Sequence, residues 1–223
     1  QLYMKIYDCF MFFDEEMLLD LRLNIMDKYV DKFVITEATY MHNGKSKKLV
    51  FDINKFSKFK DKIIYIVVDK PPPDLIKFSD NDSQDTKKSK MIDNAKKREM
   101  FQINKTQDGL INADQDDMII ISDIDEIPNL EKINLKENKK KLIFFKQKMF
   151  YYKFNLHYKS FPWYGSKACK KKYFRSPQWL RTIKNKKYPI WRLDILFSNV
   201  KHNDVFFAND GGWHFSNIRN PEG

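Results

Sequence analysis

The chain has 223 residues, of which 42% are hydrophobic and 15% aromatic, so its composition excludes a disordered chain and allows a substantial core. It holds no apolar run long enough to cross a bilayer, and two cysteines are too few for a disulfide framework. The net charge of +11 favours anionic partners, although the lysines are scattered as on a solvated surface. Cys9 lies in an apolar run and is expected to be a reduced core residue, and neither Cys9 nor Cys169 has a neighbour at metal-site spacing.

The first part of the chain predicts two strands separated by a helix. Met4–Asp8 and Phe33–Glu37 are apolar enough to be strands, and the second is expected to be covered on both faces. Asp14 can cap the helix between them. Apolar side chains then recur at helical spacing, at Leu18, Leu21, Ile25 and Tyr29.

A strand, a long helix and another strand come next. A turn at 42–45 precedes the third strand, Lys62–Asp69, which is followed by three prolines. We expect a helix from about Lys87 to Gln107, with Gly109 at its C-terminal cap, and a fourth strand at Met118–Ser122. Strands that alternate with helices and are apolar without interruption are typical of an α/β domain with a mainly parallel sheet.

The character of the sequence changes after Pro128. Leu142–Leu156 is expected to form two adjacent strands or a hairpin. Aromatic residues then become frequent, at Trp163, Tyr164, Tyr173, Phe174, Trp179, Trp191, Phe206, Phe207 and Trp213. No internal repeat is visible, so we expect a single domain over 1–223, with a nucleotide-binding-like first half and an aromatic-rich C-terminal half.

Three carboxylates follow the fourth strand within four positions, at Asp123, Asp125 and Glu126. In open α/β sheets, ligands bind beyond the carboxyl ends of the strands, and side chains two apart on an extended chain point the same way. Asp123 and Asp125 would repel each other unless a cation lay between them, and oxygen ligands suit Mg²⁺ or Mn²⁺, which also bind phosphate oxygens. The sequence therefore predicts a metal–diphosphate site. The alternative is a solvated turn, because Asp and Glu before Pro commonly end strands.

Four sequence blocks point to a family. They are DCFMFFDEEMLLDLRLN, DKFVITEAT followed by GKSKKLVF, DDMIIISDIDEIP and GGWHFS, and they run from about Tyr7 to Ser216. In this order they resemble the motifs of glycosyltransferase family 17, the β-1,4-mannosyl-glycoprotein β-1,4-N-acetylglucosaminyltransferase-like proteins. The resemblance implies a GT-A-type (Rossmann-like) fold, with a mainly parallel sheet flanked by helices. About 1–128 would form the nucleotide-sugar-binding half and about 129–223 the acceptor-side half.

The resemblance also implies a reaction. The donor would be a UDP-sugar (UDP-N-acetylglucosamine in the animal members), the cofactor Mn²⁺ or Mg²⁺, and the reaction an inverting transfer to a glycan hydroxyl. Carried over by position, Asp123 and Asp125 would hold the metal and diphosphate, with Ser122 and Glu126 as neighbours and Ser122 in the donor site. His214 would be a further metal ligand, or else a hydrogen-bonded core residue.

Further donor contacts are expected from four residues. Arg98 resembles the basic residue that GT-A enzymes place near the donor pyrophosphate, but it could instead form an ion pair within its helix. Glu37 could accept hydrogen bonds from uracil or ribose, or pair with a lysine, and Lys45 could meet phosphate. Gly212 would let the backbone approach the donor closely, or make a tight turn.

The acceptor side requires a base, because inversion deprotonates the attacking hydroxyl as it reaches the sugar. Asp210, which directly precedes the C-terminal block, is the first candidate, and Asp194 and Asp204 are its rivals. Trp163 and Tyr164 are expected to stack on the acceptor glycan, although most aromatics here must be core residues.

Partners and location are implied by the same resemblance. We expect a nucleotide-sugar donor, a glycan or glycoprotein acceptor, no nucleic acid and no membrane span. The enzyme would be cytoplasmic and of bacterial or viral type, or would act in the Golgi lumen if an N-terminal anchor precedes Gln1.

Two other functions are compatible with parts of the sequence. Positive charge and interleaved aromatics would suit a nucleic-acid-binding module, which offers no reason for the acids after the fourth strand. A haloacid-dehalogenase-like phosphatase also uses D-x-D at a strand end, but normally on the first strand and followed by Thr or Val, whereas Glu126 and Ile127 follow here.

Overall fold

The protein was analysed as a computed structural model, which describes residues 3–153, 156–189, 191–195 and 197–216. Its strands form two sheets, one of seven strands in the order β10-β6-β9-β4-β1-β2-β3 and one of four in the order β5-β11-β7-β8. The first sheet contains β1 (Ile6–Phe12), β2 (Lys32–Ala38), β3 (Ile63–Val68), β4 (Met118–Ile121), β6 (Leu142–Phe145), β9 (Lys167–Lys170) and β10 (Val205–Ala208). The second contains β5 (Glu126–Pro128), β7 (Gln147–Tyr151), β8 (His157–Trp163) and β11 (Gly212–Ser216).

The larger sheet is mainly parallel, as the sequence predicts. Among its described strands, β1 pairs in parallel with β2 and β4, β2 with β3, and β6 with β10, while β9 runs antiparallel to β4 and β6. The chain passes from β1 through α1 (Glu16–Met26) to β2 on one side, and β4 adds on the other side. The strand order therefore reverses between β1 and β4, where such sheets open a crevice for ligands.

Side chains of successive strand residues point to opposite faces of this sheet and build two core layers. Phe10 and Ile120 face α1, which contributes Leu19 and Leu23 to that layer. On the opposite face, a second layer joins side chains of β1 and β4 to Ile103 of α2 (Gln84–Lys105), and α3 (Pro177–Thr182) adds its own apolar residues there. Both faces are thus covered, which explains the uninterrupted apolar strands.

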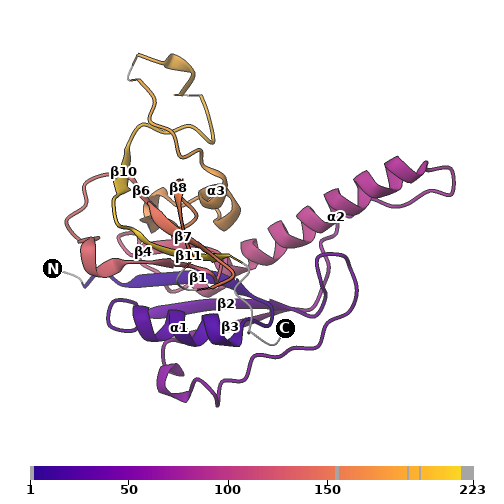
Figure 1. The fold of residues 1–223 in the computed structure, drawn as a ribbon, viewed down its shortest axis with the longest axis horizontal. Helices are drawn as coiled ribbons and strands as arrows, with labels where there is room; N and C mark the ends of the chain where they lie inside the picture. Colours follow the sequence, from indigo (N-terminus) through magenta and orange to yellow (C-terminus); the bar gives the residue numbers. More distant parts are fainter. Residues whose placement is uncertain (1–2, 154–155, 190, 196, 217–223) are drawn as a thin grey trace.

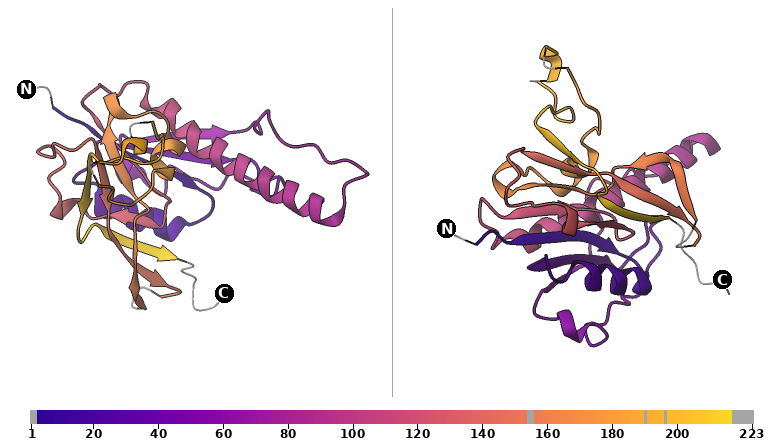
Figure 2. Two further views of the ribbon diagram at one scale, coloured as in Figure 1. Left: turned by 90° about the horizontal axis from the view of Figure 1, so that it is seen from above. Right: turned by 60° about the vertical axis from the view of Figure 1, so that its left-hand side comes forward.

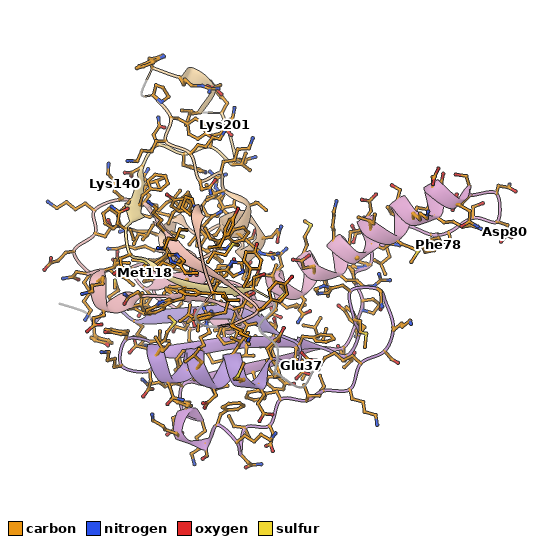
Figure 3. The ribbon with its side chains drawn as sticks, viewed as in Figure 1. Glu37, Phe78, Asp80, Met118, Lys140 and Lys201 are labelled. Carbon is orange, nitrogen blue, oxygen red and sulfur yellow. The ribbon has the colours of Figure 1, made fainter. Side chains whose placement is uncertain are left out.

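Two segments extend away from this body (Figures 1 and 2). Helix α2 is capped by Ser83, whose hydroxyl accepts a hydrogen bond from the Thr86 amide, and its first turns lie outside the body. Phe78 and Asp80 mark the far end of this arm in Figure 3. The second projection precedes β10, and Lys201 lies on it. No helix in the described part of the chain is long and apolar enough to cross a membrane.

Two local predictions are wrong, and a third is confirmed only in part. Asp14 does not cap α1, because Glu15 occupies the capping position and makes no side-chain capping bond. Gly109 lies inside a 3₁₀ turn, Thr106–Leu110, where a Cβ would lie 2.5 Å from Val34 Cγ1, so the glycine permits close packing on β2 and does not end α2. The stretch 142–156 holds two successive strands, β6 and β7, but they belong to different sheets and form no hairpin. Cys9 is a buried free thiol, as predicted, and so is Cys169.

Candidate active site

A cleft of about 680 Å³ lies at the reversal of strand order, beyond the carboxyl ends of β1 and β4. Its described lining includes four carboxylates, Glu15, Glu99, Asp123 and Asp125, and the guanidinium of Arg181. Phe12, Phe13, Leu18, Met41 and Phe215 supply apolar surface. The cleft therefore combines a strongly acidic floor with apolar walls wide enough for a nucleotide-sized ligand.

Asp123 directly follows Ser122, the last residue of the predicted fourth strand. The two oxygens of its carboxylate have different surroundings. Oδ2 accepts a hydrogen bond from Arg181 at 2.9 Å, and the other nitrogen of this guanidinium lies 2.6 Å from Glu99 Oε1. Asp123 Oδ1 is buried and has no hydrogen-bond partner. Burial raises the pKa of Asp123, and the positive charge of Arg181 opposes that rise.

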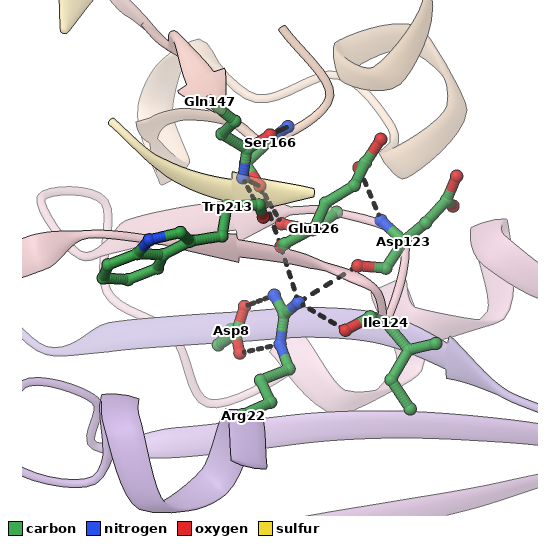
Figure 4. A network of polar contacts seen from close by, with 9 residues as sticks. Asp8, Arg22, Asp123, Ile124, Glu126, Gln147, Ser166 and Trp213 are labelled. Carbon is green, nitrogen blue, oxygen red and sulfur yellow. Dashed lines mark hydrogen bonds and ion pairs between the residues drawn. The ribbon is translucent and has the colours of Figure 1, made fainter. Parts of the chain in front are cut away.

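The acidic loop, residues 122–125 between β4 and β5, is held by hydrogen bonds between its backbone and Arg22, a fully buried residue of α1 (Figure 4). Its guanidinium binds Asp8 of β1 through two bonds of 2.8 and 2.6 Å. One further nitrogen donates to the carbonyls of Asp123, Ile124 and Glu126, at 3.0, 3.3 and 2.7 Å. A bidentate charge pair beneath three carbonyls fixes the path of the loop, and so the direction in which Asp123 and Asp125 point.

Asp125 faces the second sheet, where His214 Nε2 of β11 lies 3.3 Å from its Oδ2. The His214 ring stacks on Trp163 at 4.7 Å between centroids, and its Nδ1 is buried without a hydrogen-bond partner. Burial disfavours the imidazolium, but the hydrogen bond and charge of Asp125 outweigh it and leave the pKa of His214 raised.

Glu126 links the acidic loop to the stacked rings of Trp163 and His214. Its carboxylate accepts a hydrogen bond from the Asp123 amide at 2.9 Å and another from the Trp163 indole at 2.6 Å. Burial, reinforced by the charge of Asp123, raises the pKa of Glu126 to about 7. A Cβ at Gly165 would lie 1.8 Å from Glu126 Oε1, so glycine at that position leaves the space that this carboxylate occupies.

The donor set fits a divalent cation, although the described residues hold no preformed group of three ligating side chains. Asp123 and Asp125 line the same cleft, and the buried Oδ1 of Asp123 lacks any hydrogen-bond partner. Oxygen atoms of this kind suit Mg²⁺ or Mn²⁺, and positive charge would relieve the repulsion within the cluster. His214 lies beside Asp125 and offers the nitrogen that Mn²⁺ accepts more readily than Mg²⁺.

A comparison with known protein families matches residues 1–218 to glycosyltransferase family 17. The chain belongs to this family. It is therefore a glycosyltransferase, and the family implies a nucleotide-sugar donor and a glycan acceptor. A transferase is the interpretation favoured by the sequence blocks, and the phosphatase alternative does not fit this family. No curated protein matches the sequence.

In the structure of this glycosyltransferase, three of the predicted donor residues do not line the cleft. Arg98 donates to the carbonyl of His42 at 3.0 Å and packs against Gly44, so it holds a turn that lines the cleft but does not line the cleft itself. Lys45 is exposed on the same turn and does not line the cleft. Glu37 lies inside the body at the end of β2 (Figure 3), fully buried. Its carboxylate is occupied by the side chains of Lys47 and Tyr65 and by two backbone amides.

Ser122 and Gly212 also have structural partners in place of a donor. The Ser122 hydroxyl bonds to Ser166 at 2.8 Å, and both residues are buried. Gly212 has φ +122°, and a Cβ there would lie 2.1 Å from the Ile127 carbonyl oxygen. The glycine thus permits β11 to approach β5, a role that differs from both the donor contact and the tight turn expected from the sequence.

The predicted acceptor residues do not line the cleft. Trp163 stacks on His214 and donates a hydrogen bond to Glu126, so its ring packs against residues next to the cleft and is not open to a ligand there. Tyr164 packs into the core layer on the far face of the sheet, with its ring 5.8 Å from that of Phe207. Both side chains are used in packing, as most aromatics in a dense aromatic segment must be.

None of the three predicted bases faces the cleft. Asp210 is half exposed and paired with Lys148, and it is not among the residues that line the cleft. Asp194 lies on the second projection and pairs with Arg192 and Lys201. Asp204 pairs with Lys140. All three carboxylates are partly exposed surface charges that form ion pairs.

Three functional residues are not identified by the sequence patterns: Arg22, Glu99 and Arg181. Arg22 follows Leu18 by one helical turn on the buried face of α1, but arginine as a residue type is seldom fully buried, so the pattern alone does not mark it. Glu99 adjoins Arg98 in the block NAKKRE, so the block indicates the correct helix segment, but the neighbouring residue faces the cleft. Arg181 lies about one helical turn after the capping signal Ser176-Pro177. This signal predicts a helix start, but it does not predict that the arginine on that helix faces the cleft.

Proposed function

We propose that this glycosyltransferase is a metal-dependent, inverting enzyme of GT-A type. It would transfer a sugar, N-acetylglucosamine, from a UDP-sugar to a glycan hydroxyl. The observation that carries the proposal is the placement of Asp123 and Asp125 in one cleft at the reversal of strand order, with Asp123 Oδ1 free of any partner.

Electrostatics support the dependence on a metal. The cleft is lined by four carboxylates and a single guanidinium within the described residues, so a diphosphate would meet net repulsion there. Asp123 and Asp125 would hold Mn²⁺ or Mg²⁺, with His214 beside Asp125. When bound, the cation would supply positive charge that stabilises the departing diphosphate. The apolar walls around Phe12 and Phe13 would accommodate the uracil ring and exclude water.

The first test is donor binding and hydrolysis with and without Mn²⁺. UDP at a hundredfold excess over its Kd, together with Mn²⁺, is expected to raise Tm by about 5–10 °C, and UDP without metal by much less. A screen of UDP-sugars for release of UDP, followed by analysis of the anomeric product, identifies the donor and the stereochemistry. A protein that neither binds nor hydrolyses any UDP-sugar in Mn²⁺ would contradict the proposal.

The base belongs among the cleft carboxylates that do not form the metal pair. In the ligand-free protein Glu99 pairs with Arg181, whereas the described partners of the Glu15 carboxylate are backbone amides only, so Glu15 is the first candidate. Glu15 Oε2 accepts hydrogen bonds from the Phe13 and Asp14 amides at 3.0 and 3.2 Å, which fixes the side chain at the cleft entrance. We propose Glu15 as the base in place of Asp210.

Glu15→Gln is expected to lower kcat for transfer by about 10²-fold or more, because a glutamine keeps the backbone contacts but cannot take the proton. Binding of UDP and Mn²⁺, measured by calorimetry, should stay within about twofold of the wild type. An unchanged kcat would remove Glu15 from the reaction and leave the metal site untouched.

A further inference from the structure

Arg181 is the one lysine or arginine among the described residues that line the cleft, and it is already fully engaged. Its two terminal nitrogens lie 2.9 Å from Asp123 Oδ2 and 2.6 Å from Glu99 Oε1, so one guanidinium neutralises two carboxylates. This cation approaches the same aspartate that the proposed metal would need. Two cations therefore compete for one carboxylate.

The position of Arg181 is set by its surroundings. Helix α3 begins at Ser176, whose hydroxyl accepts from the Trp179 amide, and Leu180 is completely buried beneath it. The Gln178 amide donates to Asn104 near the end of α2, and Lys167 donates to the Arg181 carbonyl at 2.6 Å. The backbone is thereby fixed, while the side chain, one quarter exposed, has room to turn into the cleft.

The charges in the cleft determine how Arg181 responds when a metal and a diphosphate enter. A divalent cation on Asp123 Oδ1 would lie close to the Arg181 guanidinium, and like charges at such distances repel strongly in a partly buried site. A diphosphate changes the balance, because a guanidinium binds phosphate oxygens in the same two-pronged way as carboxylate oxygens.

We propose that Arg181 is an exchangeable counter-ion. In the ligand-free protein it neutralises Asp123 and Glu99, and on donor binding it turns to the diphosphate and leaves Asp123 to the divalent cation. This inference rests on the proposed function. It makes the metal and the nucleotide bind together: each alone binds weakly, because only the pair supplies both a replacement cation for Asp123 and a new anion for Arg181.

The test measures the two affinities separately in wild type, Arg181→Gln and Arg181→Lys. Binding of Mn²⁺ alone is followed by electron paramagnetic resonance, and binding of UDP at saturating Mn²⁺ by calorimetry. In Arg181→Gln, Mn²⁺ alone should bind at least about tenfold more tightly and UDP at least about tenfold more weakly than in the wild type. Lysine keeps the charge but cannot bridge both carboxylates, so Arg181→Lys should shift both affinities in the same directions by less.

A matched control is Arg175→Gln. Arg175 is an exposed arginine whose guanidinium contacts Asn199 and the Trp179 ring, outside the cleft, so both affinities should remain at wild-type values. If Arg181→Gln fails to fold, the signs in Arg181→Lys decide. Weaker or unchanged Mn²⁺ binding in the Arg181 variants would overturn the exchange. A wild type that binds UDP without any dependence on Mn²⁺ would instead overturn the proposed function.

Discussion

Arg22→Met is expected to lower the free energy of unfolding by about 3–5 kcal/mol, the largest effect of any single substitution described for this chain. The methionine fills a similar volume, but it leaves the Asp8 carboxylate buried without its guanidinium partner and removes one donor from each of three loop carbonyls. The carbonyls of Asp123 and Glu126 keep a second donor, the Glu126 amide and the Ser166 hydroxyl. An uncompensated buried charge costs far more than the ion pair itself contributes. Urea or thermal unfolding monitored by circular dichroism measures the loss.

The chain offers a control with the same geometry at the surface. Arg192 binds Asp194 through two bonds of 2.8 and 2.7 Å, as Arg22 binds Asp8, but both side chains are more than 40% exposed. Arg192→Met should leave the midpoint of unfolding unchanged within experimental error. The double variant Asp8→Asn, Arg22→Met should recover part of the loss, because it removes the orphaned charge. Equal losses in the buried and surface variants would show that burial of the pair is not what matters.

Asp125→Asn is expected to lower kcat/KM at least about 10²-fold while leaving the fold intact. The Asp125 side chain is one quarter exposed, and its described contact is the 3.3 Å approach to His214, so the amide is accommodated with little cost. What it removes is one of the two oxygen donors proposed for the metal. Transfer assays over a range of Mn²⁺ concentrations should show a higher requirement for metal, together with the lower rate at saturation.

Asp210→Asn serves as the comparison, because Asp210 also belongs to a conspicuous sequence block but pairs with Lys148 on the surface. Its activity should match that of the wild type. If Asp210→Asn abolished transfer and Asp125→Asn did not, the reaction would have to be sought outside the cleft.

The sequence was sufficient to predict the parallel strands β1 to β4 and the acidic pair that follows them, but not β9, β10 or the second sheet. Uninterrupted apolar strands can be recognised from composition alone, and a carboxylate pair directly after such a strand must lie at the carboxyl edge of a parallel sheet. Asp123 and Asp125 are placed by one strand, β4, so no long-range packing had to be known. The family resemblance of the blocks around them added the reaction, which no periodicity could supply.

The rest of the site depends on contacts between distant segments. Arg98 and Arg181 are both plausible phosphate-binding residues by type, and only the packing of α2 and α3 decides which faces the cleft. Glu37 follows an apolar strand just as Asp123 does, yet the segment after it folds back and encloses its carboxylate. A strand-end acid therefore indicates an edge of the sheet, and the following loop decides whether the acid is open to a ligand.

The short link between β4 and β5 has a consequence for the way the two sheets are joined. Ser122 to Asp125 is all the chain between a strand of the first sheet and a strand of the second, and it carries both acidic side chains of the cleft. An added residue here would turn each following side chain to the opposite face of β5 and pull the loop carbonyls away from Arg22. Insertions and deletions accumulated during evolution are thus tolerable in the two projecting arms, whereas this four-residue joint has a fixed length.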